Sequence, residues 1–165
     1  MISGRGVCVN VAWLILERYT EIKYLLIFNF PIFMKGYLVN IEQETLENTS
    51  YRRVLYTAPG SQLVLMSLLP GEEIGEEVHE LDQFIRIESG SGKAVLDGME
   101  HDLLADWAVV IPRGTQHNVI NTGTEPMKLY TIYSPPEHKD GIVFDTKAEA
   151  DAAHEHFDGK PTEAY

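Results

Sequence analysis

Residues Pro70–Gly90 read PGEEIGEEVHELDQFIRIESG and contain three side chains that can each offer a metal ion an oxygen or nitrogen atom, Glu77, His79 and Gln83. Side chains alternate between the two faces of a β-strand, so Glu77 and His79 share one face of a strand. After a bend, the same alternation turns Gln83 toward an apolar layer. This stretch therefore predicts two strands that direct three polar side chains at one point.

Residues Asp106–Asn121 read DWAVVIPRGTQHNVIN and place His117 shortly after the turn Pro112-Arg113-Gly114. The period of two puts His117, Val119 and Asn121 on one face of the strand that follows this turn. An antiparallel pairing with the first stretch would bring His117 to the same point as a fourth ligand. The interior of a β-barrel provides such a meeting point.

The first stretch resembles the first motif of the cupins. That motif is a glycine, five residues, His-x-His, three or four residues, Glu, six residues and a glycine. Gly71, Glu77-x-His79, Gln83 and Gly90 follow its spacing. Glu77 stands where the first histidine is usual, and Gln83 stands where the glutamate is usual.

The second stretch resembles the second cupin motif, a glycine, five residues, Pro-x-Gly, two residues, His, three residues and Asn. Asp106, Pro112-x-Gly114, His117 and Asn121 follow this spacing, with Asp106 in place of the turn glycine. The resemblance spans roughly residues 50–136. It implies an all-β fold, a cupin jelly-roll β-barrel of antiparallel strands, here followed by a short C-terminal helix.

The resemblance also implies a metal site made of Glu77, His79, Gln83 and His117. The usual cupin ligands are three histidines and one glutamate, which bring one negative charge. This set brings one as well, with the carboxylate moved to another corner. Mixed nitrogen and oxygen ligands suit a divalent Mn, Fe, Co, Ni or Zn ion. The alternative is that the same four side chains line a ligand pocket without a metal.

Two enzymatic functions and one non-catalytic function remain open for such a barrel, whereas a structural or storage role is a poor fit to one short barrel with polar residues at all four ligand positions. The first is a metal-dependent enzyme on a small sugar-like or carbonyl substrate, such as an isomerase similar to the mannose-6-phosphate isomerase-like cupins, with Glu77 as the catalytic base. The second is a cupin-type dioxygenase. The third is a non-catalytic, small-ligand-binding or sensory cupin; sensory cupins usually carry a DNA-binding domain, and this sequence shows no pattern for one.

Composition limits the partners. The chain has 165 residues and a formal net charge of -12, which disfavours nucleic acid and anionic membrane surfaces as partners. Uninterrupted apolar runs stay below the ~18 residues that a membrane span needs. One cysteine, Cys8, cannot form an internal disulfide, and we expect a cytoplasmic protein whose partner is a small molecule.

We expect three segments along the chain. Residues 1–33 are a doubtful leader or N-terminal extension, interpreted as a translated leader, a packed element or a signal peptide; residues 34–136 form the barrel; and residues 137–165 form a loop, a short helix and a loose tail. The pattern Thr146-x-x-Glu149 predicts a capping box that opens this helix, which we expect to run to about His156. His138 lies in the preceding polar loop, from which it could reach the barrel mouth.

Local patterns predict further elements. Asn40 is a candidate cap for a helix over residues 41–47, and residues 83–89 and 93–97 are expected to form a hairpin around Gly90-Ser91-Gly92. The strand at residues 63–69 is apolar on both faces. Burial of both faces in a small barrel favours a second copy of the chain as a cover, so we expect a homodimer.

Overall fold

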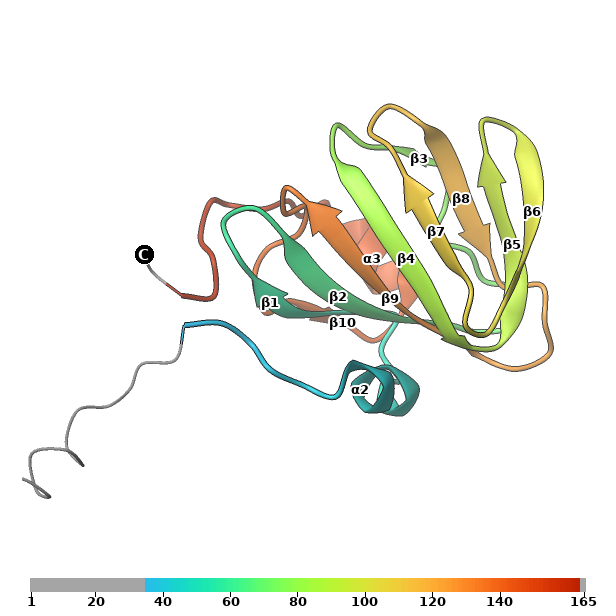
Figure 1. Cartoon of the computed structure of the whole chain (residues 1–165), viewed down its shortest axis with the longest axis horizontal. Helices are drawn as coiled ribbons and strands as arrows, with labels where there is room; N and C mark the ends of the chain where they lie inside the picture. Colours follow the sequence, from blue (N-terminus) through green and yellow to red (C-terminus); the bar gives the residue numbers. More distant parts are fainter. Residues whose placement is uncertain (1–34, 164–165) are drawn as a thin grey trace, which may run out of the picture. The chain divides into compact units, whose positions relative to one another are not determined.

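The computed structural model of the protein describes residues 35–163. Its elements in chain order are α2 (Ile41–Glu47), β1 (Arg52–Thr57), β2 (Gln62–Leu68), β3 (Glu77–Val78), β4 (Asp82–Ser89), β5 (Ser91–Leu96), β6 (Met99–Leu104), β7 (Ala108–Ile111), β8 (Gln116–Ile120), β9 (Met127–Ser134), β10 (Val143–Phe144) and α3 (Lys147–Ala153). Every strand pairing is antiparallel, and Figure 1 shows how the strands are arranged.

The strands form a six-stranded sheet in the order β10-β1-β2-β9-β4-β7 and a four-stranded sheet in the order β3-β8-β5-β6. Both sheets contribute to one hydrophobic core, for example through Ile85 of β4, Ala94 of β5 and Val119 of β8. Alternating apolar residues on each strand bury the inner faces against each other. The predicted all-β jelly roll with a short C-terminal helix is confirmed.

The predicted hairpin around Gly90 is wrong. Strands β4 and β5 are consecutive, but β4 pairs with β7 and β9 whereas β5 pairs with β6 and β8. Both edges of β4 are therefore occupied, and Gly90, with a φ of +88°, carries the chain from one sheet to the other. Gly92 lies against the backbone of β8, and a Cβ built on it would lie 2.0 Å from the Ile120 carbonyl oxygen, so a larger residue does not fit there.

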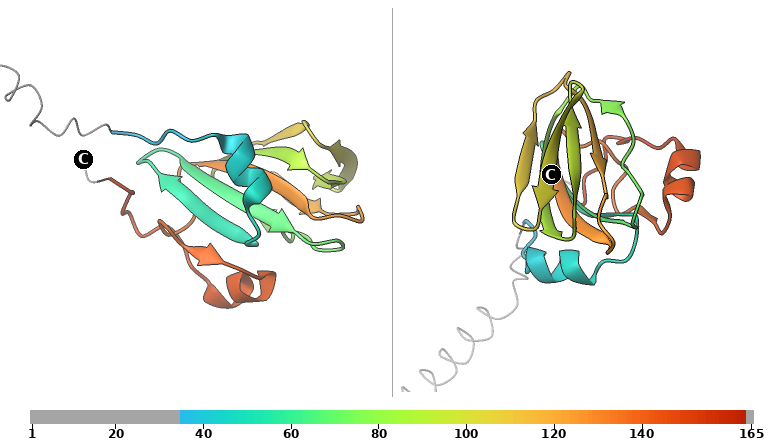
Figure 2. Two further views of the ribbon diagram at one scale, coloured as in Figure 1. Left: turned by 90° about the horizontal axis from the view of Figure 1, so that it is seen from below. Right: turned by 90° about the vertical axis from the view of Figure 1, so that its right-hand side faces the viewer.

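Helix α2 explains why β2 is apolar on both faces. The helix begins as predicted, with the Gln43 backbone N–H donating to the Asn40 side chain at 3.3 Å. It contacts β2, β4 and β9, and Figure 2 shows it lying across the outside of their sheet. Leu65 of β2 is fully buried and is not part of the inner core. The outer face thus has an internal cover, and the homodimer stays a prediction.

The C-terminal segment packs on the barrel. Strand β10 adds to the edge of the six-stranded sheet beside β1. The capping box of Thr146 and Glu149 is present as predicted, but α3 ends at Ala153 and not near His156. The reason is local, because His154 adopts a left-handed conformation with a φ of +46°.

The predicted loose tail is wrong for most of its length. The Phe157 N–H donates to the Glu137 carbonyl at 2.7 Å, and the Thr162 N–H donates to the Thr57 carbonyl at 2.9 Å. These two bonds hold the chain end along the barrel as far as Thr162. The predicted leader over residues 1–33, including Cys8, lies outside the described residues. Within residues 35–163, no helix is long and apolar enough to cross a membrane.

Candidate metal centre

Strand pairing brings the two motifs together. Strand β3 pairs with β8 so that Glu77 lies directly opposite His117, and His79 follows two residues later. One ligand atom from each of Glu77, His79 and His117 lies within 4.8 Å of the others. These three make up the metal-ligand cluster found among residues 35–163. This convergence is the one expected from the period of two in both stretches.

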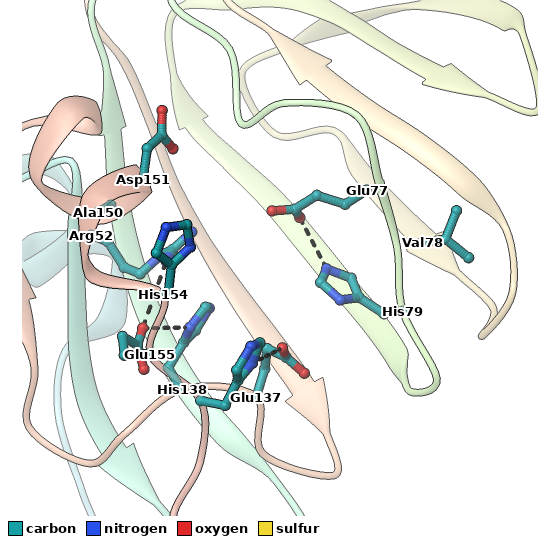
Figure 3. A pocket seen from close by; sticks show the side chains of 11 residues that line it. Arg52, Glu77, Val78, His79, Glu137, His138, Ala150, Asp151, His154 and Glu155 are labelled. Atoms are coloured by element: carbon teal, nitrogen blue, oxygen red, sulfur yellow. Dashed lines mark hydrogen bonds and ion pairs between the residues drawn. The ribbon is translucent and has the colours of Figure 1, made fainter.

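Glu77 and His79 face each other across the site, as Figure 3 shows, with Glu77 Oε2 and His79 Nε2 2.9 Å apart. Burial opposes charge on both groups, but their mutual hydrogen bond and attraction prevail, so the pKa of Glu77 is lowered and the pKa of His79 is raised. The contact holds a carboxylate oxygen and an imidazole nitrogen within hydrogen-bond distance of each other. Both facing atoms are good ligands for a divalent metal.

His117 presents a free nitrogen. Its Nδ1 lies 2.9 Å from the Thr115 carbonyl oxygen, which accepts the ring proton and leaves a lone pair on Nε2. The residue is 2% exposed, and Nε2 is buried with no hydrogen-bond partner among the described residues. A backbone carbonyl that fixes the tautomer in this way is the usual support of a metal-binding imidazole. A buried unpaired nitrogen beside Glu77 and His79 fits a cation.

Gln83 lies on β4, in the other sheet, and is 1% exposed. Its Nε2 donates to Thr131 Oγ1 at 3.1 Å, while its Oε1 is buried without a hydrogen-bond partner within the described residues. A buried unpaired oxygen is costly unless an ion or ligand uses it. The structure therefore brings three predicted ligands together and keeps the Gln83 oxygen free; ligation by Gln83 stays a prediction.

Asp106 occupies the position where the second cupin motif has a glycine. Its φ of +69° lies in the left-handed region, which explains why glycine is usual there. The Arg86 guanidinium donates to Asp106 Oδ1 at 2.8 Å. Asp is among the residues that tolerate this conformation, so the motif keeps its register despite the substitution.

A cavity of about 390 Å³ opens beside the centre (Figure 3). Glu77, Val78 and His79 line one side, and residues of α3 and the C-terminal segment line another. The full lining is Arg52, Glu77, Val78, His79, Glu137, His138, Ala150, Asp151, His154, Glu155 and His156. A small-molecule site of this size next to metal-binding side chains is the arrangement expected of a ligand pocket.

One contact in the cavity lining, between His138 and Glu155, has no signal in the sequence. The sequence predicts that His138 lies in a polar loop near the barrel mouth, but it does not predict its partner Glu155. In the structure, Glu155 Oε1 lies 2.9 Å from His138 Nδ1. The two residues are 17 positions apart in the sequence, on irregular segments, so no periodic pattern links them. His154 and His156 also line the cavity, and His156 Nδ1 lies 3.1 Å from Glu137 Oε1.

The fold and the site define a small barrel with a candidate His and Glu metal centre, and residues 64–133 match the cupin domain family. The chain belongs to the cupin superfamily. It is similar to the protein YrkC of Bacillus subtilis (strain 168), with 46% identity over 126 residues that cover 72% of this chain and 68% of YrkC. The protein L612 of Acanthamoeba polyphaga mimivirus is 49% identical over 112 residues, 65% of this chain and 70% of L612.

A solved structure supports the same assignment. The crystal structure of BH2720 from Bacillus halodurans shares 45% sequence identity with this chain and superposes with a TM-score of 0.71. The match covers 74% of this chain and 98% of BH2720. The cupin fold is therefore shared over nearly the whole of that protein.

Proposed function

We propose that the protein is a metal-dependent enzyme that acts on a small, uncharged, hydroxylated carbonyl compound of the sugar type, with isomerisation as the reaction. The observation that carries this proposal is the convergence of Glu77, His79 and His117 within 4.8 Å beside a cavity of about 390 Å³. Their donor atoms suit divalent Mn, Fe, Co, Ni or Zn.

The charge of the cavity supports an uncharged substrate. Four carboxylates line it, from Glu77, Glu137, Asp151 and Glu155, while Arg52 is the one arginine or lysine of the lining. Arg86 is outside the lining and is paired with Glu88 and Asp106. Apart from the charge of a bound ion, the lining would present a phosphate group with an excess of negative charge. We therefore propose a neutral sugar, and not a sugar phosphate, as the substrate.

A divalent ion held by Glu77, His79 and His117, with Gln83 as a fourth ligand, would polarise a substrate carbonyl. The chain's own residues supply the remaining chemistry. Glu77 is ionised, since hydrogen bonding and attraction to His79 outweigh its burial and lower the pKa of its carboxyl. As the alternative to ligation, a Glu77 carboxylate that leaves the ion would accept a proton from the carbon next to the carbonyl, with the electron pair left on the substrate.

A second candidate is a cupin-type dioxygenase. Two imidazoles and one carboxylate form the ligand set typical of non-haem iron(II) oxygenases, and His79, His117 and Glu77 are such a set. Iron would favour this candidate, and Mn, Co, Ni or Zn would favour isomerisation. A non-catalytic ligand-binding cupin is the outcome left if no metal is retained.

The test is elemental analysis of protein purified without a metal-affinity tag, beside the His117→Ala variant. We expect a stoichiometric transition metal in the wild type and its loss in the variant. The identity of the metal then selects between isomerisation of neutral aldoses and ketoses, followed by NMR, and substrate-dependent oxygen consumption. Metal-free protein in both preparations, after expression in medium supplemented with each ion, would contradict the proposal.

A further inference from the structure

The backbone of His138 is clamped to the barrel. Gln62 of β2 is 1% exposed, and its Oε1 accepts from the His138 backbone N–H at 2.9 Å. The same side chain donates from Nε2 to the His138 carbonyl at 2.6 Å and to Thr57 Oγ1 at 2.9 Å. A buried amide thus satisfies both backbone groups of a loop residue. This arrangement fixes the point from which the His138 ring projects.

The ring of His138 is also fixed by a hydrogen-bonded partner, Glu155. Glu155 Oε1 lies 2.9 Å from Nδ1, and the other Glu155 oxygen accepts from the Lys139 backbone N–H at 2.8 Å. Arg52 Nη1 approaches Glu155 Oε1 at 3.7 Å, and Figure 3 draws this contact as a dashed line that rises from Glu155. Since Glu155 is an acceptor, the ring carries its proton on Nδ1 and presents a lone pair on Nε2.

Burial keeps the His138 ring neutral. The residue is 6% exposed, and desolvation lowers the pKa of its imidazole despite the opposing attraction of Glu155. Its charged neighbours are Glu155, Arg52 and Glu137. The lone pair on Nε2 is therefore available for a hydrogen bond at neutral pH.

The free nitrogen has no structural use among the described residues. Nε2 of His138 is buried and has no hydrogen-bond partner there. A buried polar atom left unpaired destabilises the fold unless a ligand uses it. The ring lines the same cavity as Glu77 and His79, and the Tyr133 ring packs against both imidazoles, with centroids 5.0 Å from His138 and 5.9 Å from His79. His138 thus lines the pocket beside the metal centre, and its ring carries a buried nitrogen with no partner among the described residues.

We propose that His138, positioned by Glu155 and Gln62, is a second proton acceptor of this pocket beside Glu77, and that its Nε2 takes a hydrogen bond from a hydroxyl group of the ligand bound beside Glu77 and His79. This inference rests on the proposed function for the nature of the ligand. In the reaction, the proton moves from the hydroxyl oxygen to Nε2, and the electron pair stays on that oxygen. The imidazolium that forms lies against the Glu155 carboxylate, which stabilises it.

The first test reads the proton directly. Long-range ¹H–¹⁵N spectra of histidine-labelled, full-length protein, assigned with the His138→Gln variant, report which ring nitrogen carries the proton. We expect His138 to be protonated on Nδ1 and unprotonated on Nε2 at neutral pH. In Glu155→Gln, whose amide can donate as well as accept, we expect the tautomers to mix. A wild-type ring protonated on Nε2 would overturn the proposal, because that nitrogen could not accept.

The second test asks whether the nitrogen can be reached. Diethyl pyrocarbonate acylates unprotonated imidazole nitrogens, with loss of ethanol and carbon dioxide, and mass spectrometry locates each product. We expect His138 to be modified in the native protein, with exposed His101 on β6 as the internal reference, and the modified peptide to be lost in His138→Gln. A native protein modified at His101 but not at His138, with His138 reacting only after unfolding, would assign the ring a structural role.

These tests are independent of the metal centre. His138 is not among the Glu77, His79 and His117 cluster, so His138→Gln is expected to retain the metal content of the wild type. Metal loss on His117→Ala with a reachable, Nδ1-protonated His138 supports both proposals. Metal loss without that His138 state refutes the role of His138 alone, and the reverse combination refutes the metal centre alone.

Discussion

Adding Mn²⁺ to the metal-free protein is expected to raise its melting temperature, and His117→Ala is expected to remove most of this shift. An ion that binds the folded state alone stabilises it by about 2.7 kcal/mol at 100 times its dissociation constant. An unfolding entropy of about 2.1 cal/mol/K per residue, applied to roughly 130 residues of the unit Gly36–Tyr165, converts this stabilisation into a shift of about 10 °C.

His117 is the decisive ligand to remove, because its Nε2 is buried beside Glu77 and His79 and has no other partner in the described part of the chain. Each variant is compared with its own metal-free form by calorimetry, so that the cavity left by the lost ring cancels. His101→Ala deletes an exposed imidazole on β6 and is the matched control, for which the full shift is expected. An equal metal-induced shift in His117→Ala and His101→Ala would refute the assignment of this centre.

Three further predictions concern packing, ligation and pH. Gly92→Ala should lower the free energy of unfolding by at least about 3 kcal/mol in urea titrations, because its Cβ would lie 2.0 Å from the Ile120 carbonyl oxygen. Gly60→Ala is the control and should leave the free energy of unfolding nearly unchanged, because no atom lies within 4 Å of the Cβ built there. Equal effects of the two substitutions would contradict the close packing at Gly92. Gln83→Glu should tighten Mn²⁺ binding by about tenfold or more in calorimetric titrations, and an unchanged affinity would show that Gln83 is no ligand. Burial lowers the pKa of the His138 imidazole, so as the pH falls the unfolded chain binds a proton before the folded chain does. The free energy of unfolding should therefore be independent of this group above pH ~6.5 and should decrease below it by at most about 1.4 kcal/mol per pH unit. Urea unfolding curves measured on both sides of that pH should show this component in the wild type and not in His138→Gln.

Local patterns predicted much of the barrel because they depend on neighbours within a few residues. The cap at Asn40 and the capping box at Thr146 are present as expected. The alternation of side chains along β3 and β8 placed Glu77, His79 and His117 on facing positions, and the structure brings these three together. Motif spacing carried this information because each strand exposes every second residue to the same side.

Packing between distant segments decided the rest. The sequence showed that Leu65 would be buried but not that α2 would contact β2, and it placed a turn at Gly90 but not the change of sheet that follows. The pairing of His138 with Glu155 joins two irregular segments and has no period that a sequence pattern could reveal. Periodicity determines which face of a strand is buried, whereas tertiary contacts decide which segment covers that face and which side chains meet in the pocket.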